Sequence, residues 1–199
     1  YIGIYKQCRK KWLKMFNNIF STYLYHKTFN VDLKSIKKHI LKNKKENKGR
    51  KVSNYNGWQS LSMSNVDIDL KPLFNLIEQN ILELEKNLKY KGHVKLDNFW
   101  FNVNGTSSFN RPHIHTHSTI SGVFYVTVPK NSRNIVFHSP GLMDLLYPNV
   151  DHYNEFTSTT YSCEPKENLC LLFPSDLQHY VEPNLNKKER ISISFNYGF

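Results

Sequence analysis

Three histidines alternate within five residues of this chain, at His113, His115 and His117. On an extended strand, side chains two positions apart point to the same face, so two neighbouring histidines of this stretch can reach one metal ion. A third ligand must come from elsewhere, and His179 is well placed in the sequence to supply it. Imidazole binds iron, zinc, copper and nickel, so the spacing indicates a metal site without deciding which metal.

The segment around these histidines offers no carboxylate, because no Asp or Glu occurs between Asp97 and Asp144. The usual non-haem iron site combines two histidines with one carboxylate and leaves open coordination positions. Here that carboxylate cannot come from beside the histidines. The sequence therefore predicts a ligand set of three neutral imidazoles. His117 shares the face of His113 and could replace it as a ligand, but the preferred interpretation is that His117 lines the pocket or meets solvent.

Arg190 and Ser192 lie two positions apart on a predicted strand, so their side chains face the same way. Arginine presents a planar fork of N–H donors that matches a carboxylate. One interpretation is a surface arginine at the start of a strand. The other is an anchor for the far carboxylate of a dicarboxylic cosubstrate.

Positive charge is concentrated in the first quarter of the chain. Residues 1–51 hold 15 Lys or Arg against two acids, a net charge of +13, whereas residues 52–199 hold 12 Lys or Arg against 14 acids. We therefore predict a basic, helical N-terminal segment over 1–51, ending in a flexible linker over 42–51, and one domain over 52–199. The basic segment is interpreted as a solvated helical surface. A weak polyanion-binding arm and a packing or dimer element are the alternatives.

Apolar periodicity predicts helices first and strands afterwards. Helices are expected over 5–25, 31–45 and 72–90, and the last has Pro72 near its start and Gly92 placed to end it. The order indicates a mainly β sandwich or barrel with flanking helices. The expected strands cover 94–103, 120–128, 134–138, 157–162, 169–173 and 191–197, and the histidine stretch adds a seventh.

The three cysteines, Cys8, Cys163 and Cys170, show neither the spacing of a zinc knuckle nor that of a secreted disulfide framework. This usage favours a reducing compartment, so a cytoplasmic or intracellular location is expected. No apolar run approaches 18 residues, so no transmembrane helix is expected. The sequence leaves the oligomeric state open.

Several segments, taken in their order and spacing, resemble a family of 2-oxoglutarate/Fe(II)-dependent oxygenases related to the prolyl hydroxylases. The resemblance covers about residues 54–199 and implies a double-stranded β-helix (jelly-roll or cupin-like) core with N-terminal helices, in which 72–90 is a support helix. It implies a dioxygenase that hydroxylates a peptidyl, amino-acid or other small-molecule substrate with Fe(II), 2-oxoglutarate and O2. The segments that carry it are 113–115, 57–60, 121–126, 171–179, 182–184 and 189–196.

The resemblance also implies roles for single residues. It makes His113 and His115 the proximal metal ligands and His179 the distal one, because the spacing to Ser121 and Gly122 selects this pair of histidines. His115 stands where most oxygenases of the wider superfamily carry Asp. Arg190 would hold the distal carboxylate of 2-oxoglutarate. The further implied cosubstrate contacts are Ser192, Tyr125 and Asn102.

The resemblance also offers candidates for substrate contact, and the residues leave two alternative functions open. Trp100 and Arg111 are candidates for substrate contact, and apolar walls of the site are expected from Phe101, Val123, Ile193 and Phe195. One alternative is a cupin-like dioxygenase with three histidines that needs no 2-oxoglutarate, which leaves Arg190 and Ser192 unexplained. Another is a non-enzymatic, metal-binding jelly-roll module.

Overall fold

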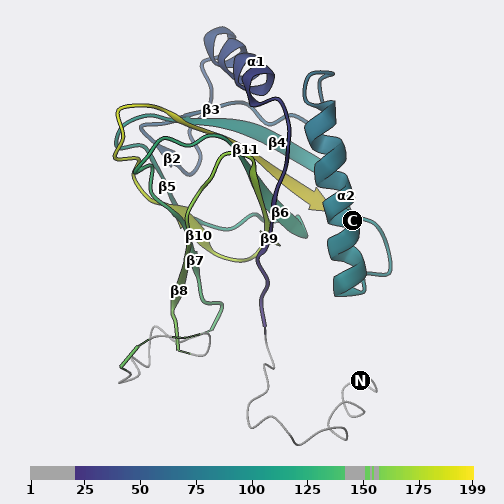
Figure 1. The fold of residues 1–199 in the computed structure, drawn as a ribbon. Coiled ribbons are helices and arrows are strands. Elements are labelled where there is room, and N and C mark those ends of the chain that lie inside the picture. The colour runs from purple at the N-terminus through teal and green to yellow at the C-terminus, as the bar shows by residue number, and fades with distance from the viewer. Residues whose placement is uncertain (1–20, 142–150, 153, 155–156) are drawn as a thin grey trace, which may run out of the picture.

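The computed structural model describes residues 21–141, 151–152, 154 and 157–199. Its centre is a pair of antiparallel β-sheets, with two helices packed against the larger sheet (Figure 1). The larger sheet has the strand order β1-β9-β6-β11-β4-β3, and the smaller has β2-β5-β10-β7-β8. The predicted mainly β architecture with flanking helices is therefore confirmed.

The predicted strands each overlap an observed one, with shifts of a few residues at their ends. The histidine stretch is the exception, because its strand ends at the first of the three histidines. The observed strands are β1 (Tyr25–Thr28), β2 (Asn54–Tyr55), β3 (Trp58–Gln59), β4 (Lys95–Asn104), β5 (Phe109–His113), β6 (Ile120–Thr127), β7 (Ile135–His138), β8 (Thr160–Cys163), β9 (Leu169–Pro174), β10 (His179–Val181) and β11 (Arg190–Gly198).

Alternation along β11 separates two environments. Ile191, Ile193 and Phe195 are buried in a core shared with both helices. Arg190 and Ser192 stand at the intervening positions, so they point to the opposite face, toward the space between the sheets. A second apolar cluster fills part of that space with side chains from β6, β7 and β9. The larger sheet thus has an apolar outer face under the helices and a partly polar inner face.

The helix α1 (Leu33–Glu46) begins at Asp32, whose carboxylate accepts hydrogen bonds from the backbone N–H groups of Lys34 and Ser35. The helix α2 (Lys71–Leu88) has Pro72 in its first turn, as predicted. It ends earlier than expected, because Lys89 adopts the left-handed conformation that Gly92 was expected to supply. Both helices bury apolar residues against the larger sheet.

The described part of the basic segment is attached to this core. β1 pairs with β9 at the edge of the larger sheet, and α1 buries Ile36 and Ile40. The helix predicted over 5–25 falls mostly outside the described residues. The predicted flexible linker over 42–51 is wrong at both ends, because α1 continues to Glu46 and the backbone of Arg50 pairs with that of Gln59. A domain boundary after residue 51 stays a prediction.

In the described part of the chain, no helix is both long enough and apolar enough to cross a membrane.

Candidate metal centre

The fold brings together three histidines from two segments of the chain. His113 is the last residue of β5 and His179 the first of β10, and the two are cross-strand partners. His115 follows in a loop, where its backbone N–H donates to the carbonyl of Ser175 at 2.8 Å. One ring nitrogen of each histidine lies within 4.8 Å of one ring nitrogen of the other two. Three imidazoles at this separation can share a single metal ion.

Each ring is held in the same tautomer. Nδ1 of His113 lies 2.6 Å from the carbonyl oxygen of Arg111, and Nδ1 of His179 lies 2.9 Å from that of Leu177. Because a carbonyl only accepts, both Nδ1 atoms carry the proton. His115 Nδ1 is 2.8 Å from the side-chain oxygen of Asn196. This leaves Nε2 of each ring with a free lone pair, the form that binds a metal.

Burial keeps the rings neutral. It lowers the pKa of His179 to about 3 and that of His115 to about 4, and the pKa of His113 is lowered in the same direction. The neighbouring histidines add repulsion between like charges at His115 and His179. At neutral pH none of the three must lose a proton before it can bind a metal ion.

His117 does not join this group. The chain turns after β5, and His117 adopts a left-handed backbone conformation with φ of 67° on the exposed surface. The expectation that three alternating histidines share one strand is therefore wrong. The pairing of His113 with His115 is produced by a strand end and a loop rather than by continuous alternation.

Asn196 is a site residue that the sequence interpretation missed. Its side-chain oxygen accepts from His115 and also from the hydroxyl of Ser121 at 2.8 Å, and its amide group donates to Asn98 at 3.1 Å. These contacts fix the amide orientation. The available signal was alternation, because Asn196 shares the inner face of β11 with Arg190.

The residues predicted to hold a cosubstrate lie in one row across three strands. Ser192 on β11 pairs with Asn102 on β4 and with Tyr125 on β6. Arg190 precedes Ser192 by two positions on the same face. Arg190 as a whole residue is 2% exposed, and its Nη1 donates to the backbone carbonyls of Ser132 and Arg133. The alternative of a surface arginine is therefore wrong.

The buried polar atoms without a hydrogen-bond partner among the described residues include Nε2 of His115, Nη2 of Arg190 and the side-chain oxygen of Asn102. Buried polar groups are rarely left unpaired in folded proteins. A hydrogen-bond acceptor beside Arg190 would pair with Nη2, and a metal ion beside His115 would accept the lone pair of Nε2. The donor set therefore fits a bound carboxylate and a bound metal ion.

The expected apolar walls are only partly correct. Val123 belongs to the cluster between the sheets. Phe101, Ile193 and Phe195 instead face the helices, where Phe195 contacts Phe74 of α2. The error is one of strand face, because Ile193 and Phe195 alternate with the polar residues of β11 and therefore lie on the side opposite to Arg190.

The two predicted substrate contacts lie in different places. The indole of Trp100 stacks on the ring of His115, with centroids 5.4 Å apart and planes 22° from parallel. Arg111 is exposed, and its guanidinium lies 5.9 Å from the centre of the Tyr55 ring. The guanidinium of Arg50 lies 5.9 Å from the centre of the Trp100 ring.

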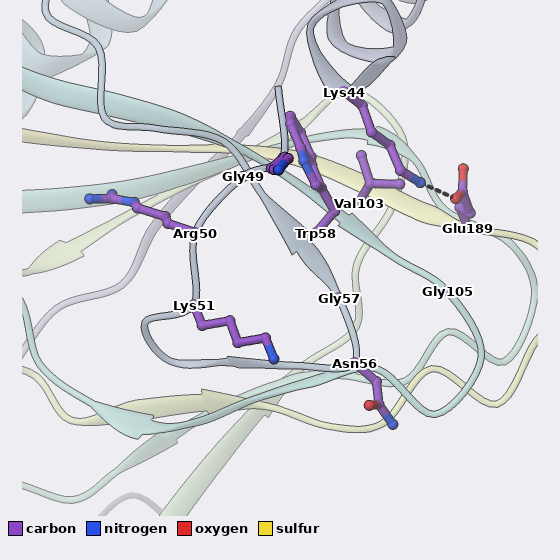
Figure 2. A pocket seen from close by; sticks show the side chains of 11 residues that line it. Lys44, Gly49, Arg50, Lys51, Asn56, Gly57, Trp58, Val103, Gly105 and Glu189 are labelled. Atoms are coloured by element: carbon purple, nitrogen blue, oxygen red, sulfur yellow. Dashed lines mark hydrogen bonds and ion pairs between the residues drawn. The ribbon is translucent and has the colours of Figure 1, made fainter. Parts of the chain in front are cut away.

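A cavity of about 440 Å³ lies beside the end of α1, and none of the three histidines lines it (Figure 2). Its wall includes four cationic residues and the indole of Trp58. The single acid, Glu189, is paired with Lys44 at 2.6 Å. This cavity is thus distinct from the space between the sheets.

Comparison with known proteins decides the family. A family profile described as "Putative 2OG-Fe(II) oxygenase" matches residues 98–196, a range that contains the three clustered histidines and Arg190. The chain belongs to the 2OG-Fe(II) oxygenases. It is an enzyme that uses Fe(II), 2-oxoglutarate and O2. No curated protein sequence matches this oxygenase.

Solved structures share its double-stranded β-helix fold. A prolyl-4-hydroxylase from Pseudomonas putida is 12% identical with a TM-score of 0.63, and the match covers 88% of this chain and 91% of that one. A Trichoplax adhaerens prolyl hydroxylase in complex with a hypoxia inducible factor peptide fragment is 13% identical, with a TM-score of 0.63 and coverages of 88% and 83%. HygX from Streptomyces hygroscopicus, with nickel, 2-oxoglutarate and hygromycin B bound, is 10% identical, with a TM-score of 0.59 and coverages of 89% and 83%. The predicted fold class is confirmed.

Proposed function

We propose that this oxygenase hydroxylates its substrate at a centre where His113, His115 and His179 hold Fe(II). The observation that carries the assignment is the shared tautomer: every Nδ1 is engaged by an oxygen acceptor, so every Nε2 is free. No carboxylate joins the cluster among the described residues. The ligand set is therefore three neutral imidazoles.

Arg190 is proposed to hold the far carboxylate of 2-oxoglutarate, with Ser192, Tyr125 and Asn102 as the row beside it. Arg190 brings a buried positive charge and an unpaired Nη2 to this position. Bound Fe(II), 2-oxoglutarate and O2 supply the oxidising power for C–H hydroxylation, with succinate and CO2 as co-products. The chain's own contribution is to orient the imidazoles, to neutralise the cosubstrate and to keep the site apart from bulk water.

A spectroscopic titration tests both assignments. Under anaerobic conditions, Fe(II) plus 2-oxoglutarate should give a weak visible charge-transfer band with the intact protein. His179→Ala should abolish the band and most Fe(II) binding, whereas His117→Ala should retain both because His117 is exposed. Full metal content in His179→Ala would contradict the ligand assignment.

The cupin-like and non-enzymatic alternatives make different predictions in a separate measurement of O2 uptake with and without 2-oxoglutarate. A three-histidine dioxygenase without a cosubstrate would consume O2 independently of 2-oxoglutarate. A non-enzymatic module would bind metal without O2 uptake. The buried Arg190, whose Nη2 has no hydrogen-bond partner among the described residues, favours a cosubstrate with a carboxylate over both alternatives.

The substrate is proposed to be a peptidyl or amino-acid group or another small molecule. Support comes from the similar structures, which include prolyl hydroxylases and a protein that holds hygromycin B. An untargeted search by mass spectrometry for gains of one oxygen atom in candidate peptides and metabolites tests the proposal. Products found only with added 2-oxoglutarate would identify the class.

A weak contact with polyanions through α1 is a second proposal. Four lysines, Lys34, Lys38, Lys42 and Lys45, are exposed at helical spacing on one side of α1. Replacing all four with Gln should remove any affinity for nucleic acid, and this affinity should fall steeply with salt. Salt-insensitive binding would argue for a specific packed interface instead.

An intracellular location is proposed on the state of the cysteines. Cys163 and Cys170 are free thiols. Thiol counting on denatured protein from its native source tests this, since an oxidising compartment would leave fewer free thiols.

A further inference from the structure

The backbone around Arg50 is fixed next to the large sheet. The N–H of Arg50 donates to the carbonyl of Gln59 at 2.8 Å, and its carbonyl accepts from the side chain of Asn54 at 3.3 Å. Gly49, just before it, has φ of 72°, and a Cβ there would come within 2.6 Å of the Trp58 indole. The segment is therefore held in one conformation by residues on both sides.

From this fixed backbone, consecutive side chains leave in different directions. Figure 2 shows Lys51 extending across the cavity, while Arg50 points away from it. The guanidinium of Arg50 lies over Trp100, and Trp100 stacks on His115. Arg50 is thus only one aromatic ring removed from a proposed metal ligand.

The guanidinium of Arg50 lacks a partner of opposite charge. It forms no ion pair with any carboxylate of the described residues, and its Nε is buried without a hydrogen-bond partner among them. The stretch from Asn98 to Met143, which contains Trp100 and His115, has no acid at all. A half-buried cation with an unused N–H donor is a ready site for an anion.

We propose that Arg50 binds an anionic group of the substrate, a carboxylate or phosphate, beside Trp100 at the metal centre. The inference rests on the proposed function of that centre and adds the class of substrate that it accepts. Arg50 acts here as a specificity-determining residue, through direct contact with the substrate.

The anionic group is not the far carboxylate of 2-oxoglutarate. Arg190 is paired with Asn104 across β11 and β4, whereas Trp100 is paired with Ser194. Along β11, Arg190 is four residues from Ser194, the partner of Trp100, and this spacing corresponds to about 13 Å. Arg190 is therefore placed for that carboxylate, and Arg50 for a different anionic group at the level of His115.

Three small ligands with the same ring test the proposal: phenylacetate, phenyl phosphate and neutral phenylacetamide. Binding is measured by calorimetry on the metal-free protein and on the Fe(II) and 2-oxoglutarate complex under anaerobic conditions, at constant ionic strength. Absorption of the complex is followed in parallel. The variants are Arg50→Gln, Arg50→Lys and, as the matched control, Lys51→Gln, which removes the neighbouring charge on the cavity side.

We expect at least one anion to bind the complex at least tenfold more tightly than phenylacetamide and to alter its visible band. Arg50→Gln should remove this preference, Arg50→Lys should keep part of it, and Lys51→Gln should leave it unchanged. Phenylacetate and phenyl phosphate then identify which anion is favoured. The proposal is overturned if neither anion is preferred, if Arg50→Gln keeps the preference, or if Lys51→Gln loses it equally.

The failure of the proposed function would look different. In that case the visible band would not form with Fe(II) and 2-oxoglutarate alone, before any ligand is added. Calorimetry on the metal-free protein would still show whether Arg50 selects an anion.

Discussion

The side-chain oxygen of Asn196 lies 2.8 Å from Nδ1 of His115, a residue 81 positions earlier in the chain. This contact holds the imidazole of His115 in one orientation at the site. The oxygen is oriented toward a ring N–H, because it also accepts from Ser121 while the amide group donates to Asn98. The surroundings of residue 115 are therefore arranged for histidine and not for the shorter carboxylate of Asp.

Replacing Asn196 with Ala should weaken Fe(II) binding by about 10–100-fold, the usual effect of losing a partner that orients a ligand. The free energy of binding can be measured by calorimetry with Fe(II) under anaerobic conditions. Asn98→Ala is the matched control, since it leaves the contact between His115 and Asn196 in place. An equal loss of Fe(II) affinity in both variants would contradict a specific role for the contact between His115 and Asn196.

His115→Asp should lower Fe(II) affinity and 2-oxoglutarate-dependent O2 uptake without abolishing either. The carboxylate can bind iron, but it is shorter than imidazole and leaves the oxygen of Asn196 without one of its donors. His115→Ala should lose nearly all activity. O2 uptake should be measured with and without 2-oxoglutarate for the three proteins. Uptake that is independent of 2-oxoglutarate in all of them would favour the cupin-like alternative.

Arg190→Gln should raise the 2-oxoglutarate concentration needed for half-maximal turnover by about tenfold or more, because a charge-assisted hydrogen bond contributes about 1.5–3 kcal/mol. Arg190→Lys should need a 2-oxoglutarate concentration between those of Arg190→Gln and the native protein. The measurement is uncoupled succinate formation, with Fe(II) content as the control. Unchanged succinate formation at low 2-oxoglutarate in Arg190→Gln would place the anchor elsewhere.

The stability of the metal-free protein should fall as the pH drops below about 6.5, the ordinary pKa of histidine. His179 has a pKa of about 3 in the folded state, so the unfolded chain takes up a proton at this residue while the folded chain does not. Between pH 6.5 and pH 5 this difference lowers the free energy of unfolding by about 2 kcal/mol. Urea unfolding at both pH values measures it, and His179→Gln should show a smaller decrease by about that amount.

Gly122→Ala should destabilise the fold by about 1–3 kcal/mol, the usual cost of overpacking. A Cβ at Gly122 would come within 2.3 Å of the Phe195 ring and 2.8 Å of the Leu171 carbonyl oxygen, which belong to the two strands on either side of β6. Gly105→Ala is the control, because nothing lies within 4 Å of its added Cβ. The measurement is the midpoint temperature of thermal unfolding for both variants. Equal midpoints would contradict the packing argument.

The grouping of His113, His115 and His179 and the burial of Arg190 agree with the expectations from the sequence, while the roles of these residues in binding stay predictions. The reason given for the grouping was wrong, because His115 reaches the site from a loop and not by alternation along a strand. Asn196 and Arg50 were missed because their partners depend on how distant segments are placed in space. His115 meets Asn196 only once β11 is placed beside the loop after β5, and residue types alone do not specify that placement.

The faces of the central strands were assigned wrongly although the sequence carried a signal. Ile193 alternates with Arg190 and Ser192 on β11, so a strand that turns those two residues to the site turns Ile193 to the helices. The edge of the sheet was missed for a different reason. The residues of β1 belong to the segment that was predicted to be basic and helical. They form a strand because they pair with β9, more than 140 residues later in the chain.

The pairing of His113 with His179 has a consequence for how the enzyme acquires iron. Backbone hydrogen bonds between β5 and β10 bring these two residues together, and the loop that carries His115 is tied to Ser175. The binding geometry is thus assembled by the sheet before any ion arrives, unlike the site of a zinc finger, whose folding depends on the metal. Loss of iron should leave an intact protein that can be reloaded, so its working fraction would follow the iron supply without the chain having to refold.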